Sequence, residues 1–245
     1  MDRIILSERV DEVSDIRSLQ EWFNQLLKDA GVEVSIGRIN NRWLYVEASK
    51  VSLFSSMLNL QVYYPLEVAE RPILRTCWVE KIQGNNVTYS YPLIDGSSKF
   101  SRSRLDDWVG YLGCGKDSLD CLDVLKSTGV QVGYPINLTI NKPSVLYRKL
   151  LERLTILGLD VVFVRGLTPL ELNSILDREI VNKFTADYIH LTLTTHILYL
   201  KLGVKPSKAI EKLSETASKL SIPLTYTICE WKKLESILSL LETNI

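Results

Sequence analysis

Apolar positions in the first seventy residues alternate between the period of strands and the period of helices. RIILS is a short β-branched run, and apolar residues then recur at helical spacing from Ser14 to Ala30. Gly31 follows where a helix needs a left-handed C-terminal cap. The runs VEVSIGRI and WLYVEAS flank Asn40-Asn41, a pair that suits a tight hairpin because asparagine tolerates positive φ. KVSLFSSMLNL and QVYYPLEV predict a second helix and a last strand, so the order is βαββαβ, the ferredoxin-like arrangement.

The middle third of the chain changes character. ILRTCWVEKI and NVTYSYPL are β-rich runs joined through Gln83-Gly84-Asn85-Asn86, a strong hairpin signal, and SSKFSRSRL indicates a third strand. A helix is expected at about 118–127, and YPINLTI predicts another strand. Several short strands with one interposed helix are typical of a small β-barrel of the S1 or OB type.

A second alternating series begins after Pro143 with a connecting helix, VLYRKLLERLTIL. LDVVFV predicts a strand, and TPLELNSILDREIV predicts a helix with Thr168 as N-cap, Pro169 in the first turn and Glu171 at the capping-box position. ADYIHLTL and HILYLKLG predict a strand pair, KPSKAIEKLSETASKL a helix and IPLTYTI a closing strand, with WKKLESILSLL as a final amphipathic stretch. The order βαββαβ therefore occurs a second time.

These patterns predict an α+β protein of three domains, which agrees with a length of 245 residues, more than one domain usually has. Two ferredoxin-like βαββαβ units, at residues 1–69 and 143–245, flank a small S1/OB-like β-barrel at residues 70–142.

Composition narrows the classes of partner. Hydrophobic residues make up 46% and charged residues 24%, as in a soluble globular protein. The 29 Lys and Arg balance 29 Asp and Glu, so no whole-molecule field draws the chain to a polyanion, and any nucleic-acid surface must be local. The sequence has no apolar run of about 18 residues, and MDRIILSERV lacks the apolar core of a signal peptide. We therefore expect a cytoplasmic protein with no membrane partner.

The stretch GYLGCGKDS, residues 110–118, nearly matches a phosphate-binding loop. Gly110, Gly115 and Lys116 are in place, but Asp117 stands where the hydroxyl that binds Mg²⁺ should be. The preceding SRSRLDDWV is also a poor buried strand. A glycine-rich turn with Asp117 as the N-cap of the next helix accounts for the same residues, so we expect no nucleotide cofactor.

Catalytic and metal-binding patterns are weak. His190 and His196 are six residues apart, whereas metal ligands on one helical face need a spacing of three or four, and six residues along one strand span about 20 Å. The four cysteines form no C-x-x-C pair. No nucleophile elbow or His-Glu metal motif occurs, which favours a non-enzymatic protein without a metal.

The segment SSKFSRSR holds the strongest basic cluster. Its candidate residues are Lys99, Phe100, Arg102 and Arg104. Such a mixture contacts phosphates with its cations while the ring stacks on a base. Asp106 and Asp107 follow directly, and a solvated strand or loop is the alternative interpretation.

Trp43 and Tyr45 form a second candidate, because they alternate with Leu44 and Val46 on a predicted strand. One pair therefore faces the helices and the other faces away from them. Outward aromatic rings would form a stacking platform for RNA, while core packing or a domain interface is the alternative.

Four segments carry a resemblance to a known family: WLYVEAS, WVEKIQGNNVTYSYPL, the turn LGCGKDS, and LYLKLGVKPSKAI. With the three-part order of elements, they resemble an archaeal family of uncharacterised proteins known as a domain of unknown function. The resemblance implies an S1-like barrel in the central part and an RNA-related role, and it implies no catalytic residues.

We therefore expect a non-enzymatic RNA-binding or ribonucleoprotein-associated factor that binds through its central domain. The alternative is a protein–protein interaction or assembly module without nucleic-acid binding, which the neutral net charge favours. A ligand-binding regulatory role for the C-terminal unit is a third interpretation.

Overall fold

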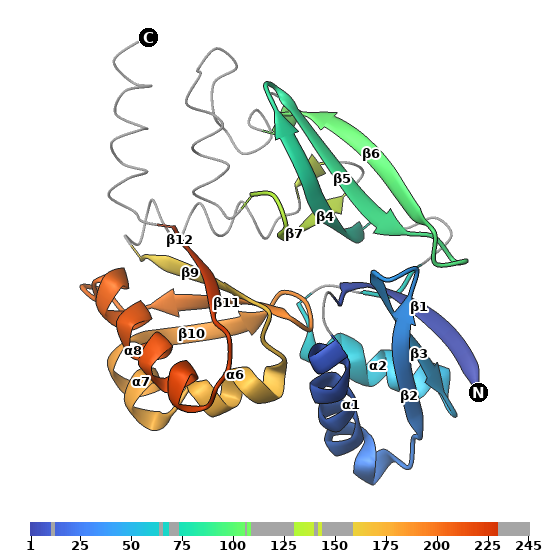
Figure 1. The fold of residues 1–245 in the computed structure, drawn as a ribbon, viewed down its shortest axis with the longest axis horizontal. Coiled ribbons are helices and arrows are strands. Elements are labelled where there is room, and N and C mark those ends of the chain that lie inside the picture. Colours follow the sequence, from blue (N-terminus) through green and yellow to red (C-terminus); the bar gives the residue numbers. More distant parts are fainter. Residues whose placement is uncertain are drawn as a thin grey trace.

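The computed structural model describes residues 1–10, 13–63, 66–68, 74–105, 107–108, 130–139, 142–143 and 159–229. Within these ranges the chain is an α+β protein with three antiparallel sheets, five α-helices and one short 3₁₀ helix (Figure 1). The α+β prediction is thus confirmed. The glycine-rich turn at 110–118 with the helix expected after it, the connecting helix at 145–157 and the amphipathic stretch at 231–241 lie outside the described residues.

The N-terminal sheet has the strand order β1-β3-β2. Its elements are β1 (Asp2–Arg9), α1 (Val13–Leu27), the 3₁₀ helix (Lys28–Ala30), β2 (Val34–Ile39), β3 (Trp43–Ala48) and α2 (Val51–Gln61). The turn between β2 and β3 has positive φ at Asn40 (53°) and Asn41 (52°), and Gly31 ends the 3₁₀ helix at φ 58°. The predicted hairpin and cap are therefore confirmed.

The predicted fourth strand of this sheet, QVYYPLEV, is reduced to a single β-bridge between Leu6 and Glu67 in the described residues. The Ser7 amide donates to the Leu66 carbonyl at 2.6 Å, and the Val68 amide donates to the Ile5 carbonyl at 3.1 Å. Gln61 belongs to α2 instead, and proline has no amide to donate to a ladder. Among the described residues the sheet therefore has three regular strands, and the predicted fourth strand is present only as this bridge.

The central sheet is open. It consists of β4 (Leu74–Gln83), β5 (Asn86–Pro92), β6 (Ser98–Arg104), β7 (Pro135–Thr139) and β8 (Lys142–Pro143). The order is β6-β5-β4-β7-β8, so β6 and β8 are opposite edges among the described residues, and the closed S1/OB-like barrel was not found there. A barrel buries one face of its sheet by closing on itself, whereas here β4 packs with residues of the C-terminal sheet on one face and of the N-terminal sheet on the other.

The C-terminal sheet has the order β10-β11-β9-β12, antiparallel throughout. Its elements are β9 (Val161–Arg165), α6 (Pro169–Ile175), α7 (Arg178–Lys183), β10 (Thr185–His190), β11 (Thr195–Leu200), α8 (Pro206–Lys219) and β12 (Thr225–Cys229). The capping box of Thr168 and Glu171 is present. The single helix expected at 168–181 is two helices, because the Asp177 side chain accepts a hydrogen bond from the Ile180 amide and caps α7 separately.

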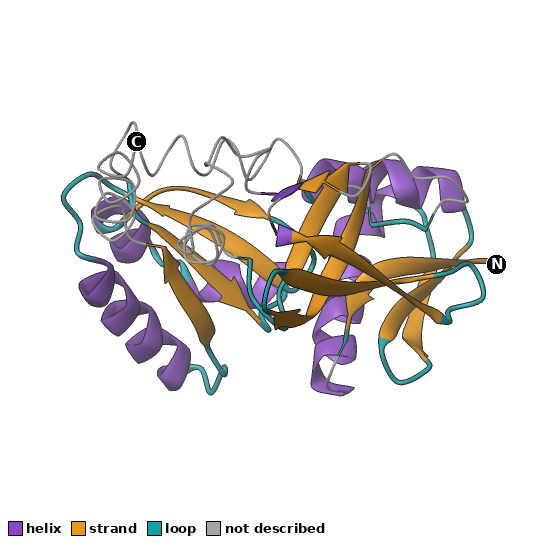
Figure 2. Ribbon diagram, turned by 90° about the horizontal axis from the view of Figure 1, so that it is seen from above, coloured by secondary structure: helices purple, strands orange, loops and turns teal. Residues whose placement is uncertain are grey.

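Both faces of the C-terminal sheet are buried. Val162 and Val164 of β9 pack in the core formed with the helices, while Val161 and Phe163 belong to the core shared with the central sheet. Helix α8 lies at the outer end of the molecule, beyond these strands (Figure 2). The runs VVFV and ILYL are therefore continuously apolar rather than alternating, because a sheet covered on two faces has no solvent side.

The N-terminal sheet is covered in the same way. Leu44 and Val46 pack under α1 and α2. Ile5 and Trp43 face the opposite direction and pack against Trp78 of β4, which agrees with the position of the central sheet above the N-terminal sheet in Figure 1. The surface where these two sheets meet is the setting of the candidate site.

Candidate nucleic-acid interface

Strand β6 presents one aromatic ring and two guanidinium groups in a row. Phe100 pairs with Ser90 of β5, and Arg102 and Arg104 follow at two-residue steps. Because side chains alternate along a strand, these three lie on one face at intervals of about 7 Å. All three are exposed, Phe100 to 56%. We call Phe100, Arg102 and Arg104 the β6 row.

Lys99, the fourth member of the predicted cluster, does not belong to this row. It pairs with Tyr91 across the β5–β6 ladder and points to the opposite face of the sheet from Phe100. The structure thus divides the cluster that the sequence placed together, and Lys99 lines a separate pocket.

Phe100 lies beside a partly buried polar network that the sequence did not indicate. The Arg42 guanidinium carbon is 5.8 Å from the centre of the Phe100 ring and 5.1 Å from that of Trp43. Arg42 also donates to Ser90 Oγ at 3.0 Å and pairs with the carboxylate of Glu80, which in turn accepts from Ser90. The ring of Phe100 therefore rests against a fixed cation, and the far face of the ring is exposed. In the sequence, Arg42 is marked only by its position between the Asn40-Asn41 turn and Trp43, which does not indicate a contact with β5 or β6.

Trp43 is fully buried. Its indole N–H donates to Ser98 Oγ at 2.8 Å, and its ring packs with Ile5 and Trp78 between the two sheets. The predicted alternation on β3 is correct. The face that carries Trp43, which the stacking hypothesis needs exposed, is covered at Trp43 by the central sheet. Trp43 thus positions the start of β6 and has no ring face available to a base.

Tyr45 lies farther along the same face of β3 and is half-buried. The Arg3 guanidinium carbon is 4.6 Å from the centre of its ring. The ring also lies over Gly37, where an added Cβ would come within 2.5 Å of it. These contacts hold Tyr45 in place as a packing residue beside Arg3.

Glu8 is a buried carboxylate at the contact between β1 and the loop that joins β10 to β11. It accepts hydrogen bonds from Thr194 Oγ1 at 2.6 Å, the Leu193 amide at 2.6 Å and Thr192 Oγ1 at 3.3 Å. Burial raises its pKa to about 7, although these bonds and the charge of Arg165 act in the opposite direction. Glu8 therefore joins the N-terminal and C-terminal parts of the chain.

The two histidines meet, contrary to the sequence interpretation. His190 and His196 are partners across the β10–β11 hairpin, with Nδ1 atoms 2.9 Å apart. His196 also bonds the Leu167 carbonyl through Nε2 at 2.6 Å, and its pKa is lowered to about 3 by burial and by the neighbouring His190. Burial lowers the pKa of His190 as well. A hydrogen-bonded, neutral pair therefore stabilises the hairpin.

The structure contains few other reactive clusters. Among the described residues, no group of three or more His, Cys, Asp or Glu side chains is arranged to hold a metal ion. Cys77 and Cys229 are buried free thiols, and Cys114 and Cys121 lie outside the described ranges. In the part of the chain that the structure describes, no helix is both long and apolar enough to cross a membrane.

Neither of two comparisons of the sequence, with protein-family models and with curated proteins, identified a match. No protein-family model matches the sequence, and no curated protein is significantly similar to it. The resemblance to an archaeal family described above therefore stays a prediction.

Proposed function

We propose that this protein is a non-enzymatic RNA-binding factor that contacts single-stranded RNA through the β6 row. The observation that carries the proposal is the exposed ring of Phe100, aligned on one strand face with the exposed guanidinium groups of Arg102 and Arg104. A base stacks on such a ring without sequence preference, while arginines neutralise the adjacent phosphates.

Two further points support an RNA ligand. The cation of Arg42 behind the Phe100 ring holds the ring in place, so less entropy is lost when a base stacks on it. The resemblance to the archaeal family implies an RNA-related role.

We also propose that the outer units are ferredoxin-like. The antiparallel order β10-β11-β9-β12, with helices between β9 and β10 and between β11 and β12, supports this assignment for the C-terminal unit. In the N-terminal unit, the order β1-β3-β2 and the bridge of Leu6 to Glu67 support a version with a reduced fourth strand.

Binding of a labelled single-stranded RNA, measured by fluorescence anisotropy at about 50 and about 200 mM salt, tests the RNA proposal. We expect Phe100→Ala to weaken binding by about 1–3 kcal/mol through lost stacking. The double variant Arg102→Glu with Arg104→Glu should weaken it by about tenfold or more and flatten the dependence on salt, because two phosphate contacts are lost.

The matched control changes net charge by the same amount elsewhere. Lys208 and Lys219 are exposed on α8, and Lys208→Glu with Lys219→Glu should leave RNA affinity nearly unchanged. Equal losses in the two double variants would show that only net charge matters, and undetectable binding at the lower salt concentration would refute the proposal.

A second candidate function is docking of a protein partner by strand addition at β6. Among the described residues β6 pairs only with β5, so its outer edge is available for backbone hydrogen bonds. Arginines on an edge strand also discourage unwanted pairing, which is a competing reason for the charges of the β6 row. A complex recovered from lysate that survives nuclease and is kept in Arg102→Gln, but is lost in Arg102→Pro, would favour a protein partner, because the register of the ladder directs the amide of Arg102 to this edge.

A further inference from the structure

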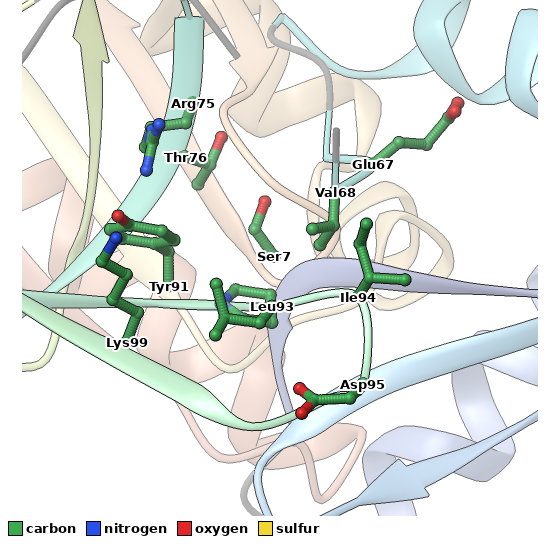
Figure 3. A pocket seen from close by; sticks show the side chains of 11 residues that line it. Ser7, Glu67, Val68, Arg75, Thr76, Tyr91, Leu93, Ile94, Asp95 and Lys99 are labelled. Carbon is green, nitrogen blue, oxygen red and sulfur yellow. The ribbon is translucent and has the colours of Figure 1, made fainter. Parts of the chain in front are cut away.

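A pocket of about 520 Å³ lies at the junction of the N-terminal and central sheets. It is bounded by the start of β4, the end of β5, the turn after β5, the start of β6, and short segments of the N-terminal part (Figure 3). A volume in the range of about 300–1,000 Å³ is typical of sites for small molecules. Lys99 lines this pocket, so the pocket is on the opposite face of β6 from the β6 row.

One wall of the pocket carries two cations around an aromatic ring. The Arg75 guanidinium carbon is 4.2 Å from the centre of the Tyr91 ring, which holds the guanidinium group in a fixed orientation. Lys99 pairs with Tyr91 across the β5–β6 ladder, and Figure 3 shows its ammonium beside the tyrosine. Lys99 forms no ion pair within the described part of the chain. This wall therefore favours an anionic group.

The two carboxylates near the pocket are directed elsewhere. Asp95 accepts hydrogen bonds from the amide and the hydroxyl of Ser97, at 2.9 and 2.6 Å, and these bonds lower its pKa. The carboxylate of Glu67 extends away from Arg75 and Lys99 in Figure 3. Among the described residues, neither of these carboxylates is therefore paired with Lys99, the exposed cation of this wall.

The other side of the pocket is apolar. Leu93 and Ile94 belong to the turn after β5 and are 39% and 61% exposed, and Val68 lies near them. Apolar side chains that stay exposed to water cost free energy. An apolar ligand surface that packs against them would remove both surfaces from water, which favours binding.

We propose that this pocket binds a small organic anion, a carboxylate or phosphate carried on an apolar body. Arg75 and Lys99 hold the anionic group, and Leu93 and Ile94 cover the body. The site is separate from the β6 row and does not depend on RNA binding.

Isothermal titration calorimetry with four probes tests whether the ligand needs both an anionic group and an apolar body. Octanoate and octyl phosphate carry a carboxylate and a phosphate on an apolar body, whereas acetate lacks the body and 1-octanol lacks the charge. We expect saturable binding of octanoate, octyl phosphate or both, which also tells a carboxylate site from a phosphate site, and no binding of the two controls. Failure of both anions to bind, or equal affinity for octanol and octanoate, would overturn the proposal.

Variants on the two faces of β6 identify the site. Lys99→Gln should weaken binding of the anion by about tenfold, as expected for the loss of a charge-assisted hydrogen bond. Arg102→Gln, three residues along the same strand but on the other face, should leave the affinity unchanged. Arg75→Gln should also weaken binding, with circular dichroism to verify its fold. Unchanged affinity in Lys99→Gln would place the anion elsewhere and refute the assignment.

Discussion

At the scale of single residues, Glu8 shows how burial changes the chemistry of a side chain. Its carboxylate is fully buried and accepts three hydrogen bonds from residues 192–194. Burial nevertheless raises its pKa from 4.5 to about 7, so removing the carboxylate from water outweighs the three bonds. The folded state is therefore more stable when Glu8 is protonated, although the hydrogen bonds from residues 192–194 favour the ionised carboxylate.

This shift predicts the sign of the pH dependence. Between about pH 4.5 and 7, the unfolded chain releases the Glu8 proton while the folded chain keeps it. The free energy of unfolding should therefore fall as pH rises through this window, by about 3 kcal/mol in all. Urea denaturation gives the free energy of unfolding at pH 5 and at pH 8. The difference between these two values should be smaller in Glu8→Gln than in the wild type by about this amount, because the amide does not titrate.

Glu21→Gln is the control for Glu8→Gln, since Glu21 is exposed on α1. Its pH profile should match that of the wild type. A Glu8→Gln profile that also matches the wild type would mean that Glu8 does not titrate in this window.

At the scale of elements, helix α6 depends on its N-terminal cap. Thr168 Oγ1 accepts from the Glu171 amide at 3.3 Å, and the Glu171 carboxylate accepts from the Thr168 amide at 2.7 Å. The same carboxylate accepts from Ser18 of α1 at 3.2 Å through its other oxygen. The cap therefore serves both the start of α6 and its contact with α1.

Removal of the cap should destabilise the protein measurably. Thr168→Ala leaves the Glu171 amide without its side-chain acceptor and should lower the free energy of unfolding by about 1–2 kcal/mol in a urea titration. Ser174→Ala, at an exposed site on the same helix, should change it by less than about 0.5 kcal/mol. Equal effects of the two substitutions would contradict the capping argument.

At the scale of the whole molecule, the hydrophobic cores cross between the sheets. One core combines residues of the central and C-terminal sheets, and Trp78 of β4 packs with Ile5 and Trp43 of the N-terminal sheet. Trp78 also donates its indole N–H to the Ser7 carbonyl at 2.8 Å. The three sheets are thus expected to unfold together.

We predict a single unfolding transition, in which tryptophan fluorescence and far-ultraviolet circular dichroism give the same midpoint. Trp78→Ala should lower the free energy of unfolding by about 3–5 kcal/mol, because it leaves a cavity between two sheets. Leu60→Ala, at a largely exposed position, should cost less than about 0.5 kcal/mol. Separate transitions for the two probes in the wild type would show that the sheets fold independently.

The candidate site was only partly predictable. The position of β6 followed from the local pattern, whereas the interpretation of Lys99 and Phe100 as one cluster overlooked the alternation of side chains along the strand. The involvement of Arg42 did not follow from the local pattern, because its contacts with Ser90 and Glu80 join residues more than thirty positions away in the chain.

Local features of this protein were determined by the sequence alone. Positive φ at Asn40 and Asn41, the box of Thr168 and Glu171, and most strand positions follow from neighbouring residues. The contact of His190 with His196 followed from the register of the β10–β11 hairpin. Only the tertiary structure decided that Trp43 is covered and that, among the described residues, the central sheet is open. Stacking of separate layers sets these outcomes, and the residues that meet there have no periodic relation along the chain.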